Sequence, residues 1–109
     1  MKLSEVVEKT GLEALNEWED TELDGVYVSD MVSDIITGAS GCGLLLTLQT
    51  HKSLIAAANL VDVEAVVFAH DKRPADDVLE LAGKAGIALF TTPDHTWKYA
   101  VKLFELGLR

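Results

Sequence analysis

The fold of this chain is decided by residues 22–48, which read ELDGVYVSDMVSDIITGASGCGLLLTL. Residues 22–28 alternate between polar and apolar side chains, as a strand does. Residues 31–37 predict a helix with one apolar face. Glycines 38, 41 and 43 end this helix, and the apolar run 44–48 predicts a strand covered on both faces, as parallel strands usually are. The stretch therefore predicts two parallel strands joined by a helix.

The same alternation of helices and strands extends over the rest of the chain. We expect further helices at 3–9, 53–61, 76–85 and 94–106, further strands at 12–15, 64–69 and 87–90, and an exposed acidic connection at 16–21. Strands that alternate with helices imply right-handed crossovers between parallel neighbours. The predicted fold is a three-layer α/β domain over residues 1–109, with an open, mostly parallel sheet and helices on both faces.

Composition excludes several classes of protein. The 109 residues fit a single domain, and 9 basic against 18 acidic residues give a net charge of −9. This charge disfavours nucleic acid and anionic membrane surfaces as partners. No apolar run approaches the ~20 residues of a membrane span, and the N-terminus does not have the form of a signal peptide. With Cys42 as its single cysteine, the chain is expected to be soluble and cytoplasmic, without a disulfide or a multi-cysteine zinc site.

Two motifs at strand-to-helix junctions carry a family resemblance. Residues 25–34, Gly-Val-Tyr-Val-Ser-Asp-Met-Val-Ser-Asp, resemble the GxYVSDxLSD stretch of stand-alone DRTGG-domain proteins. Residues 46–51, Leu-Thr-Leu-Gln-Thr-His, resemble their ITLQTH segment, and residues 86–92 are similar to their GIPxxxT segment. The resemblance covers about residues 3–108.

This resemblance implies a regulatory or dimerisation role. DRTGG domains occur alone or beside CBS domains in regulatory pyrophosphatases, and they resemble the N-terminal domain of HPr kinase. The chain departs from the family pattern at one place. Where many members have Thr-Gly-Gly after the third central strand, it has Ala69-His70-Asp71.

The sequence lacks the elements that catalysis on phosphates would need. It contains no Walker loop, and its glycine-rich segment 38–43 precedes a strand, whereas a phosphate-binding loop follows one. Cys42 and His51 lie at opposite ends of one predicted strand, roughly 20 Å apart, so they cannot act as a nucleophile and base. We therefore expect no kinase activity, no catalytic residue and no cofactor.

Metal binding is also disfavoured. His51, His70, Asp71, Asp94 and His95 follow strands, but none has the close spacing of a metal site. The histidines are expected to cap helices or to form ordinary hydrogen bonds.

A ligand site is predicted where the parallel strands end, because ligands of open α/β sheets bind outside the carboxyl ends of the strands. Free amide groups at the following helix starts favour an anionic or polar ligand. Helix capping alone would explain Ser29, Asp30, Thr50 and Asp94, but it would not explain Gln49 or His51. The candidate ligand-binding residues are Ser29, Asp30, Gln49, Thr50, His51, His70 and Thr92.

Three functions are compatible with these observations. The leading hypothesis is a non-enzymatic, homodimeric regulatory domain that senses a small anionic ligand or nucleotide. The alternative is a small enzyme or nucleotide-binding protein that uses the polar cluster at the strand ends, and a pure protein-interaction module is a third hypothesis.

The homodimer is predicted from the last helix, which carries two apolar stripes. The first stripe, which we expect to pack on the sheet, contains Trp97, Ala100, Val101, Phe104 and Leu108. The second stripe, Tyr99, Leu103 and Leu106, is expected to bind a second copy of the chain. Alternatively, the second stripe packs against the first helix through Leu3 and Val7.

Overall fold

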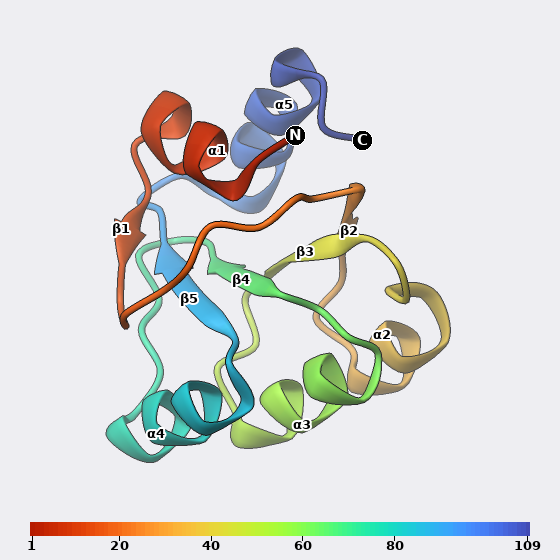
Figure 1. Cartoon of the computed structure of the whole chain (residues 1–109), viewed down its shortest axis with the longest axis vertical. Coiled ribbons are helices and arrows are strands. Elements are labelled where there is room, and N and C mark those ends of the chain that lie inside the picture. The colour runs from red at the N-terminus through yellow and green to blue at the C-terminus, as the bar shows by residue number, and fades with distance from the viewer.

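A five-stranded sheet forms the centre of the computed structural model, which describes residues 1–109 (Figure 1). The strands lie in the order β1-β5-β4-β3-β2. Strands β2 to β5 are parallel and neighbour one another in chain order, whereas β1 is antiparallel to β5. The strands are β1 (Glu13–Ala14), β2 (Gly25–Val28), β3 (Gly43–Thr47), β4 (Ala65–Phe68) and β5 (Ala88–Thr91).

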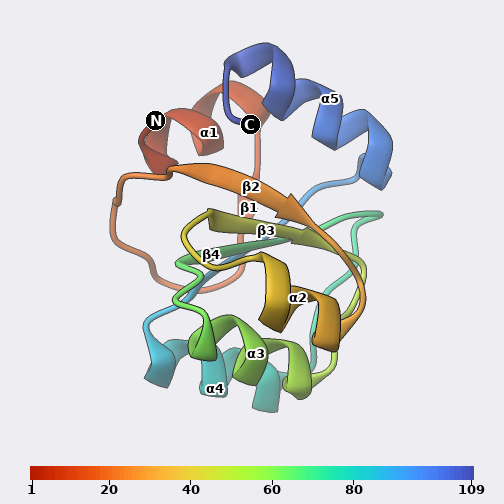
Figure 2. The ribbon, with the colours of Figure 1, turned by 90° about the vertical axis from the view of Figure 1, so that its right-hand side faces the viewer.

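Helices cover both faces of this sheet (Figure 2). The crossover helices α2 (Val32–Gly38), α3 (Lys52–Leu60) and α4 (Asp76–Ala85) lie on one face. Helices α1 (Leu3–Thr10) and α5 (Thr96–Leu106) lie on the other. The predicted three-layer α/β fold is therefore confirmed. None of the five helices is long and apolar enough to cross a membrane.

Two hydrophobic cores explain the unbroken apolar strands. Along β3, Leu45 belongs to the core beneath α2, α3 and α4, whereas Leu44 and Leu46 belong to the core beneath α1 and α5. Successive side chains of a strand point to opposite faces, so a strand between two helical layers must be apolar at every position. All three leucines are fully buried.

Helix α1 begins at Leu3, as predicted, but a serine near its start does not act as its cap. Its N-cap is Lys2, without a side-chain cap, and Ser4 lies inside the first turn. The Ser4 backbone N–H and hydroxyl both donate to the carboxylate of Asp20, at 2.9 and 2.7 Å. These bonds lower the pKa of Asp20 and fasten the acidic connection to α1. The helix ends at Gly11, whose left-handed φ of 68° is the usual conformation of a glycine after a helix.

The two stripes of α5 depart from their expected roles, although Ala100 and Leu108 of the first stripe do pack in the core beneath α1 and α5. Tyr99 and Leu103, placed on the dimer surface by the sequence analysis, are 0% exposed. Trp97 and Phe104, expected to pack on the sheet, are 73% and 57% exposed. The alternative is the correct one, because Leu3 of α1 shares a core with Tyr99 and Leu103, and Val7 packs against that core. The proposed interface at Leu103 is therefore wrong.

Candidate functional site

The residues predicted to bind a ligand lie along one edge of the sheet, which we call the carboxyl edge. Strand register places Val28 beside Leu46, and Phe68 beside both Thr47 and Thr91, so the four parallel strands end together. Ser29 and Asp30 follow β2, Gln49, Thr50 and His51 follow β3, His70 follows β4, and Thr92 follows β5. Within this edge the residues form two groups, one at β2 and β3 and the other at β4 and β5.

The β2–β3 group is held by hydrogen bonds that shape its own loops. Asp30 Oδ1 accepts from Leu48 N at 2.7 Å and from Thr47 Oγ1 at 3.1 Å, so Asp30 joins the ends of two strands. It does not cap α2, whose N-cap is Met31. Ser29 Oγ accepts from Met31 N at 3.2 Å and likewise serves its own turn.

The loop between β3 and α3 uses Gln49 and His51 in the same local way. Gln49 Oε1 accepts from His51 N at 3.1 Å, and His51 Nδ1 accepts from Ser53 N at 3.2 Å. His51, rather than Thr50, is thus the N-cap of α3. Gln49 and His51 were the two residues that helix capping did not explain in the sequence. In the structure, Gln49 shapes the loop before α3 and His51 caps the helix.

The β4–β5 group lies where the chain changes faces. The loop after β4 leads to α4 on one face of the sheet, and the loop after β5 leads to α5 on the other (Figure 1). Adjacent parallel strands whose connections leave on opposite faces form the switch point at which α/β sheets bind ligands. Between the other pairs of parallel strands, all crossovers run through helices on the same face.

Backbone hydrogen bonds join the two loops at this switch point. His70 N donates to Asp94 O at 2.9 Å, and Asp71 N donates to Thr92 O at 2.7 Å. Thr92 itself is buried, and its hydroxyl accepts from Asp94 N. Thr92 therefore supports the loop from inside and does not present its side chain to a ligand.

Two histidine rings are exposed at the switch point. The ring centroids of His70 and His95 lie 6.1 Å apart, with one ring from each loop. His95 caps α5 by accepting from Lys98 N through Nδ1, at 3.3 Å, which leaves Nε2 without a partner in the chain. Asp94, expected as the cap, instead pairs with Lys98 and Lys102, and the contact with Lys102 lowers its pKa. The capping role that sequence analysis expected of the histidines is thus confirmed for His95, which was not among the predicted ligand-binding residues.

The turn that carries His70 has an unfavourable backbone. His70 and Asp71 have φ values of 58° and 55°, and Lys72 N donates to Ala69 O at 3.1 Å, which makes a type I′ turn. Left-handed conformations are cheap for glycine and cost other residues roughly 1–2 kcal/mol each. These are the positions where many DRTGG domains carry Gly-Gly.

Arg73 anchors this turn to the edge of the sheet. Its guanidinium donates to both carboxylate oxygens of Glu13 in β1, at 2.6 and 2.9 Å, and to Asp71 at 3.0 Å. These hydrogen bonds raise the pKa of Arg73, and the same contact lowers the pKa of Glu13. The carboxyl edge carries all three histidines together with Lys52, Lys72, Arg73 and Lys98, and the carboxylates of Asp30, Asp71 and Asp94 lie among them.

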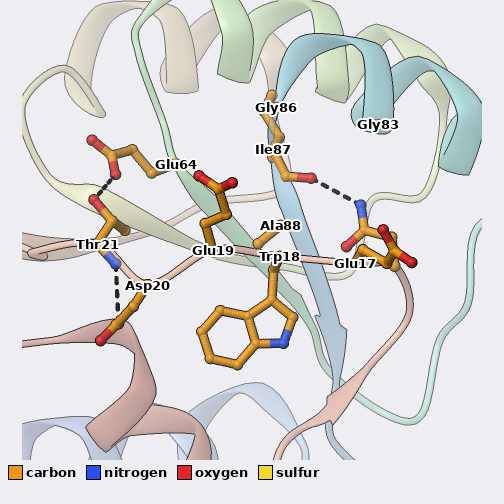
Figure 3. A pocket seen from close by; sticks show the side chains of 11 residues that line it. Glu17, Trp18, Glu19, Asp20, Thr21, Glu64, Gly83, Gly86, Ile87 and Ala88 are labelled. Carbon is orange, nitrogen blue, oxygen red and sulfur yellow. Dashed lines mark hydrogen bonds between the residues drawn. The ribbon is translucent and has the colours of Figure 1, made fainter.

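The main cavity lies at the opposite edge of the sheet and has a volume of about 850 Å³ (Figure 3). Sequence analysis expected only an exposed connection here. Two residues of that connection form part of the wall. Asn16 Nδ2 donates to Ile87 O and its Oδ1 accepts from Leu89 N, and the Trp18 ring packs edge-on against the ring of Phe90. Thr21 is hydrogen-bonded to Glu64 across the cavity. The lining residues are Asn16, Glu17, Trp18, Glu19, Asp20, Thr21, Glu64, Gly83, Gly86, Ile87 and Ala88.

Four carboxylates make this cavity unsuitable for an anion: Glu17, Glu19, Asp20 and Glu64. No lysine, arginine or histidine is among the lining residues. A second cavity, of about 320 Å³, separates Lys9 and Thr10 of α1 from Lys102, Glu105 and Leu106 of α5. Neither cavity contains a residue predicted to bind a ligand.

Comparisons with known proteins identify a similar fold. A crystal structure of the CBS and DRTGG domains of the regulatory region of Clostridium perfringens pyrophosphatase, in complex with its activator diadenosine tetraphosphate, matches with a TM-score of 0.70. Sequence identity is 18%, and the match covers 91% of this chain and 44% of that chain. This chain thus spans less than half the length of that chain, and the likeness confirms a DRTGG-like fold. No protein-family model and no curated protein matches the sequence.

Proposed function

We propose that this chain is a non-enzymatic, cytoplasmic regulatory domain that acts as a homodimer and senses a small anionic ligand, such as a nucleotide, at its carboxyl edge. Within that edge, the switch point between β4 and β5 is the binding position that the geometry favours. His70 and His95 are the residues that would contact the ligand there.

The observation that carries this proposal is the pair of exposed imidazoles at the switch point. They come from two loops that leave on opposite faces and are joined by backbone hydrogen bonds, so a ligand bound there would contact both. Imidazole nitrogens donate hydrogen bonds to phosphate oxygens, and the N-terminus of α5 adds a favourable dipole. The strained turn at His70 is the kind of backbone feature that concentrates at functional sites.

The fold comparison supports the regulatory part of the proposal. The similar structure belongs to a regulatory region that was crystallised with a dinucleotide activator. The predicted residues at the ends of β2 and β3, which include Ser29, Asp30, Gln49 and His51, would shape the loops beside the ligand. Their hydrogen bonds within the chain favour this supporting role.

A thermal-shift experiment with paired variants tests the ligand site. Diadenosine tetraphosphate and ATP are the probes, and we expect them to raise the Tm of the wild-type chain. His70→Gly removes one imidazole at a position whose φ suits glycine, and His95→Asn removes the other while keeping a good N-cap. Both variants should fold and lose the shift.

Asp62→Gly is the matched control, because Asp62 also has a positive φ, of 58°, but precedes β4 at the opposite edge. It should keep the full ligand response. If none of the probes shifts the wild-type Tm, or if both histidine variants respond normally, the proposed site is wrong.

The same preparations distinguish a sensor from a small enzyme. We expect no release of phosphate from ATP, because the chain has no Walker loop and segment 38–43 precedes β3. Turnover that co-purifies with the chain and is lost in His70→Gly or His51→Ala would instead support the alternative of an enzyme.

A further inference from the structure

The outer edge of β2 has backbone groups without partners. β2 ends the sheet and pairs only with β3. Gly25 N donates to Cys42 O, just before β3, at 2.7 Å, and Ser29 N donates to Leu46 O of β3 at 3.2 Å. Backbone groups of a strand point alternately to its two sides. The N–H and C=O groups of Val26 and Val28 therefore point away from β3, and no strand of the chain pairs with β2 on that side.

This edge also lacks the features that usually keep edge strands from pairing. Charged side chains, prolines, bulges and very short strands serve that purpose. The sequence Gly-Val-Tyr-Val of β2 contains no charge and no proline. By contrast, β1 at the other edge has two residues, and one of them, Glu13, is paired with Arg73.

Exposed apolar side chains surround the same edge. Figure 2 shows β2 between α5 above and α2 below. Tyr99 and Leu103 of α5 face the core, and Lys102 and Leu106 line the cavity beside α1. By helical periodicity, Trp97 and Phe104 lie on the side of α5 that faces away from α1. Five of the seven large exposed apolar residues of the chain belong to these three elements: Val28 to β2, Met31 and Ile36 to the N-cap and body of α2, and Trp97 and Phe104 to α5. A clustered apolar surface of this kind marks an interface.

We propose that this face binds a second copy of the chain, with β2 pairing antiparallel to β2 of that copy across a two-fold axis at Tyr27. Val26 of one copy would then lie opposite Val28 of the other, and their outward N–H and C=O groups would bond in both directions. In this arrangement the same strand from two copies forms both sides of the interface. The result is a closed dimer in which the two sheets join into one continuous sheet. The inference builds on the homodimer of the proposed function and assigns its interface.

A second copy would find one positive group at the start of β2, the Arg109 guanidinium, where the two-fold register otherwise sets Asp24 opposite Asp30 of the other copy. The backbone oxygen of Arg109 lies next to Gly25, at 2.7 Å from where a β-carbon would stand, and the guanidinium lies 4.2 Å from the ring centroid of Phe104. Antiparallel pairing brings this end of β2 near Asp30 of the other copy, just beyond its Val28. Asp30 uses only Oδ1 within its own chain, so Oδ2 is free to meet Arg109. Such pairs would offset the repulsion between two chains of charge −9.

Sedimentation of a lysine variant at this edge tests the interface. Val28→Lys places a charge at an outward position that is 44% exposed, so the monomer should fold normally. Leu60→Lys is the matched control, because Leu60 is 68% exposed on α3 and lies outside the face. At tens of micromolar, we expect the wild type and Leu60→Lys at twice 11.8 kDa, and Val28→Lys at 11.8 kDa.

A second variant, Trp97→Lys, should also give the monomer mass, since Trp97 is 73% exposed on the same face. A wild-type mass of 11.8 kDa, or a Val28→Lys chain that stays at the dimer mass, overturns the proposal. Diadenosine tetraphosphate added to monomeric Val28→Lys separates the two proposals. A normal thermal shift of Val28→Lys means that the ligand site does not depend on the interface. A wild-type chain that is dimeric but shows no thermal shift refutes only the ligand site.

Discussion

The left-handed pair His70 and Asp71 leads to a prediction about stability. A β-carbon in this conformation costs roughly 1–2 kcal/mol, and glycine loses about 0.5–1 kcal/mol through its greater freedom in the unfolded chain. We therefore expect His70→Gly to raise the free energy of unfolding by about 1 kcal/mol, and the Tm by about 4–8 °C. Urea unfolding, followed by circular dichroism, measures the change.

Asp62→Gly should give a similar gain, since its φ of 58° matches that of His70. Because Asp62 has the same conformation at the opposite edge, a gain at both positions measures the backbone cost alone, and the ligand response of His70→Gly decides whether that cost serves binding. If His70→Gly destabilises the chain, the imidazole has a structural role, and the argument from strain fails.

Tyr99 predicts the behaviour of the chain at alkaline pH. Its hydroxyl lies 2.8 Å from Thr10 Oγ1, and burial raises the pKa of the phenol well above its usual value. In the unfolded chain, Tyr99 ionises near pH 10, but in the folded chain it stays neutral. Stability from this residue is therefore complete below pH 10 and is lost as the pH rises further.

Tyr99→Phe isolates this effect. At pH 7 the variant should lose about 0.5–1.5 kcal/mol, the usual net contribution of a hydrogen bond. Above pH 10 its free energy of unfolding should fall less steeply than that of the wild type. Parallel slopes for the two proteins in urea titrations from pH 8 to pH 11 would contradict the prediction.

At the scale of elements, the two stripes of α5 should respond oppositely to a charge. Leu103→Glu places a carboxylate in a core where the leucine is 0% exposed, so we expect a loss of about 3–5 kcal/mol or failure to fold. Phe104→Glu changes a side chain that is 57% exposed, and the monomer should keep its fold. Thermal unfolding in dilute solution compares the two variants, and equal losses would mean that α5 is rotated from the position described.

Sequence analysis assigned the wrong stripe of α5 to the core because the sequence of α5 alone does not show which side α1 covers. Both have helical spacing and bulky apolar residues, and Trp97 and Phe104 are as apolar as Tyr99 and Leu103. What decides between them is the position of α1, which meets α5 from a segment 89 residues away, as the bond between Thr10 and Tyr99 shows. Periodicity within one helix does not contain that information.

The strands and crossovers, in contrast, could be predicted well from local signals. An unbroken apolar run such as 44–48 indicates a buried strand, and a left-handed glycine such as Gly86 indicates a helix end. Each of these signals lies within a single element, and together they predict the alternation of strands and helices that makes the strands parallel. The candidate site was only partly predictable. The shared edge follows from the alternation, but the bonds of Asp30 to β3 and the caps at His51 and His95 depend on how loops meet.

At the scale of the whole molecule, the proposed dimer predicts that stability depends on concentration. Association stabilises the folded state by mass action, so the Tm of the wild type should rise as protein concentration increases. The Tm of Val28→Lys should stay constant over the same range. Calorimetry over a hundred-fold range of concentration measures both, and a constant wild-type Tm would speak against a dimer.

The meeting of α1 with α5 brings the two ends of the chain together (Figures 1 and 2). A side-chain carbon of Met1 lies 3.8 Å from the place of a β-carbon at Gly107. A polypeptide that enters and leaves at one point can be spliced into a single surface loop of another protein without separating the flanking segments of its host. The fold is therefore suited to insertion as a domain within other proteins, and a circular permutant opened between the exposed residues Ser40 and Gly41 should preserve its core.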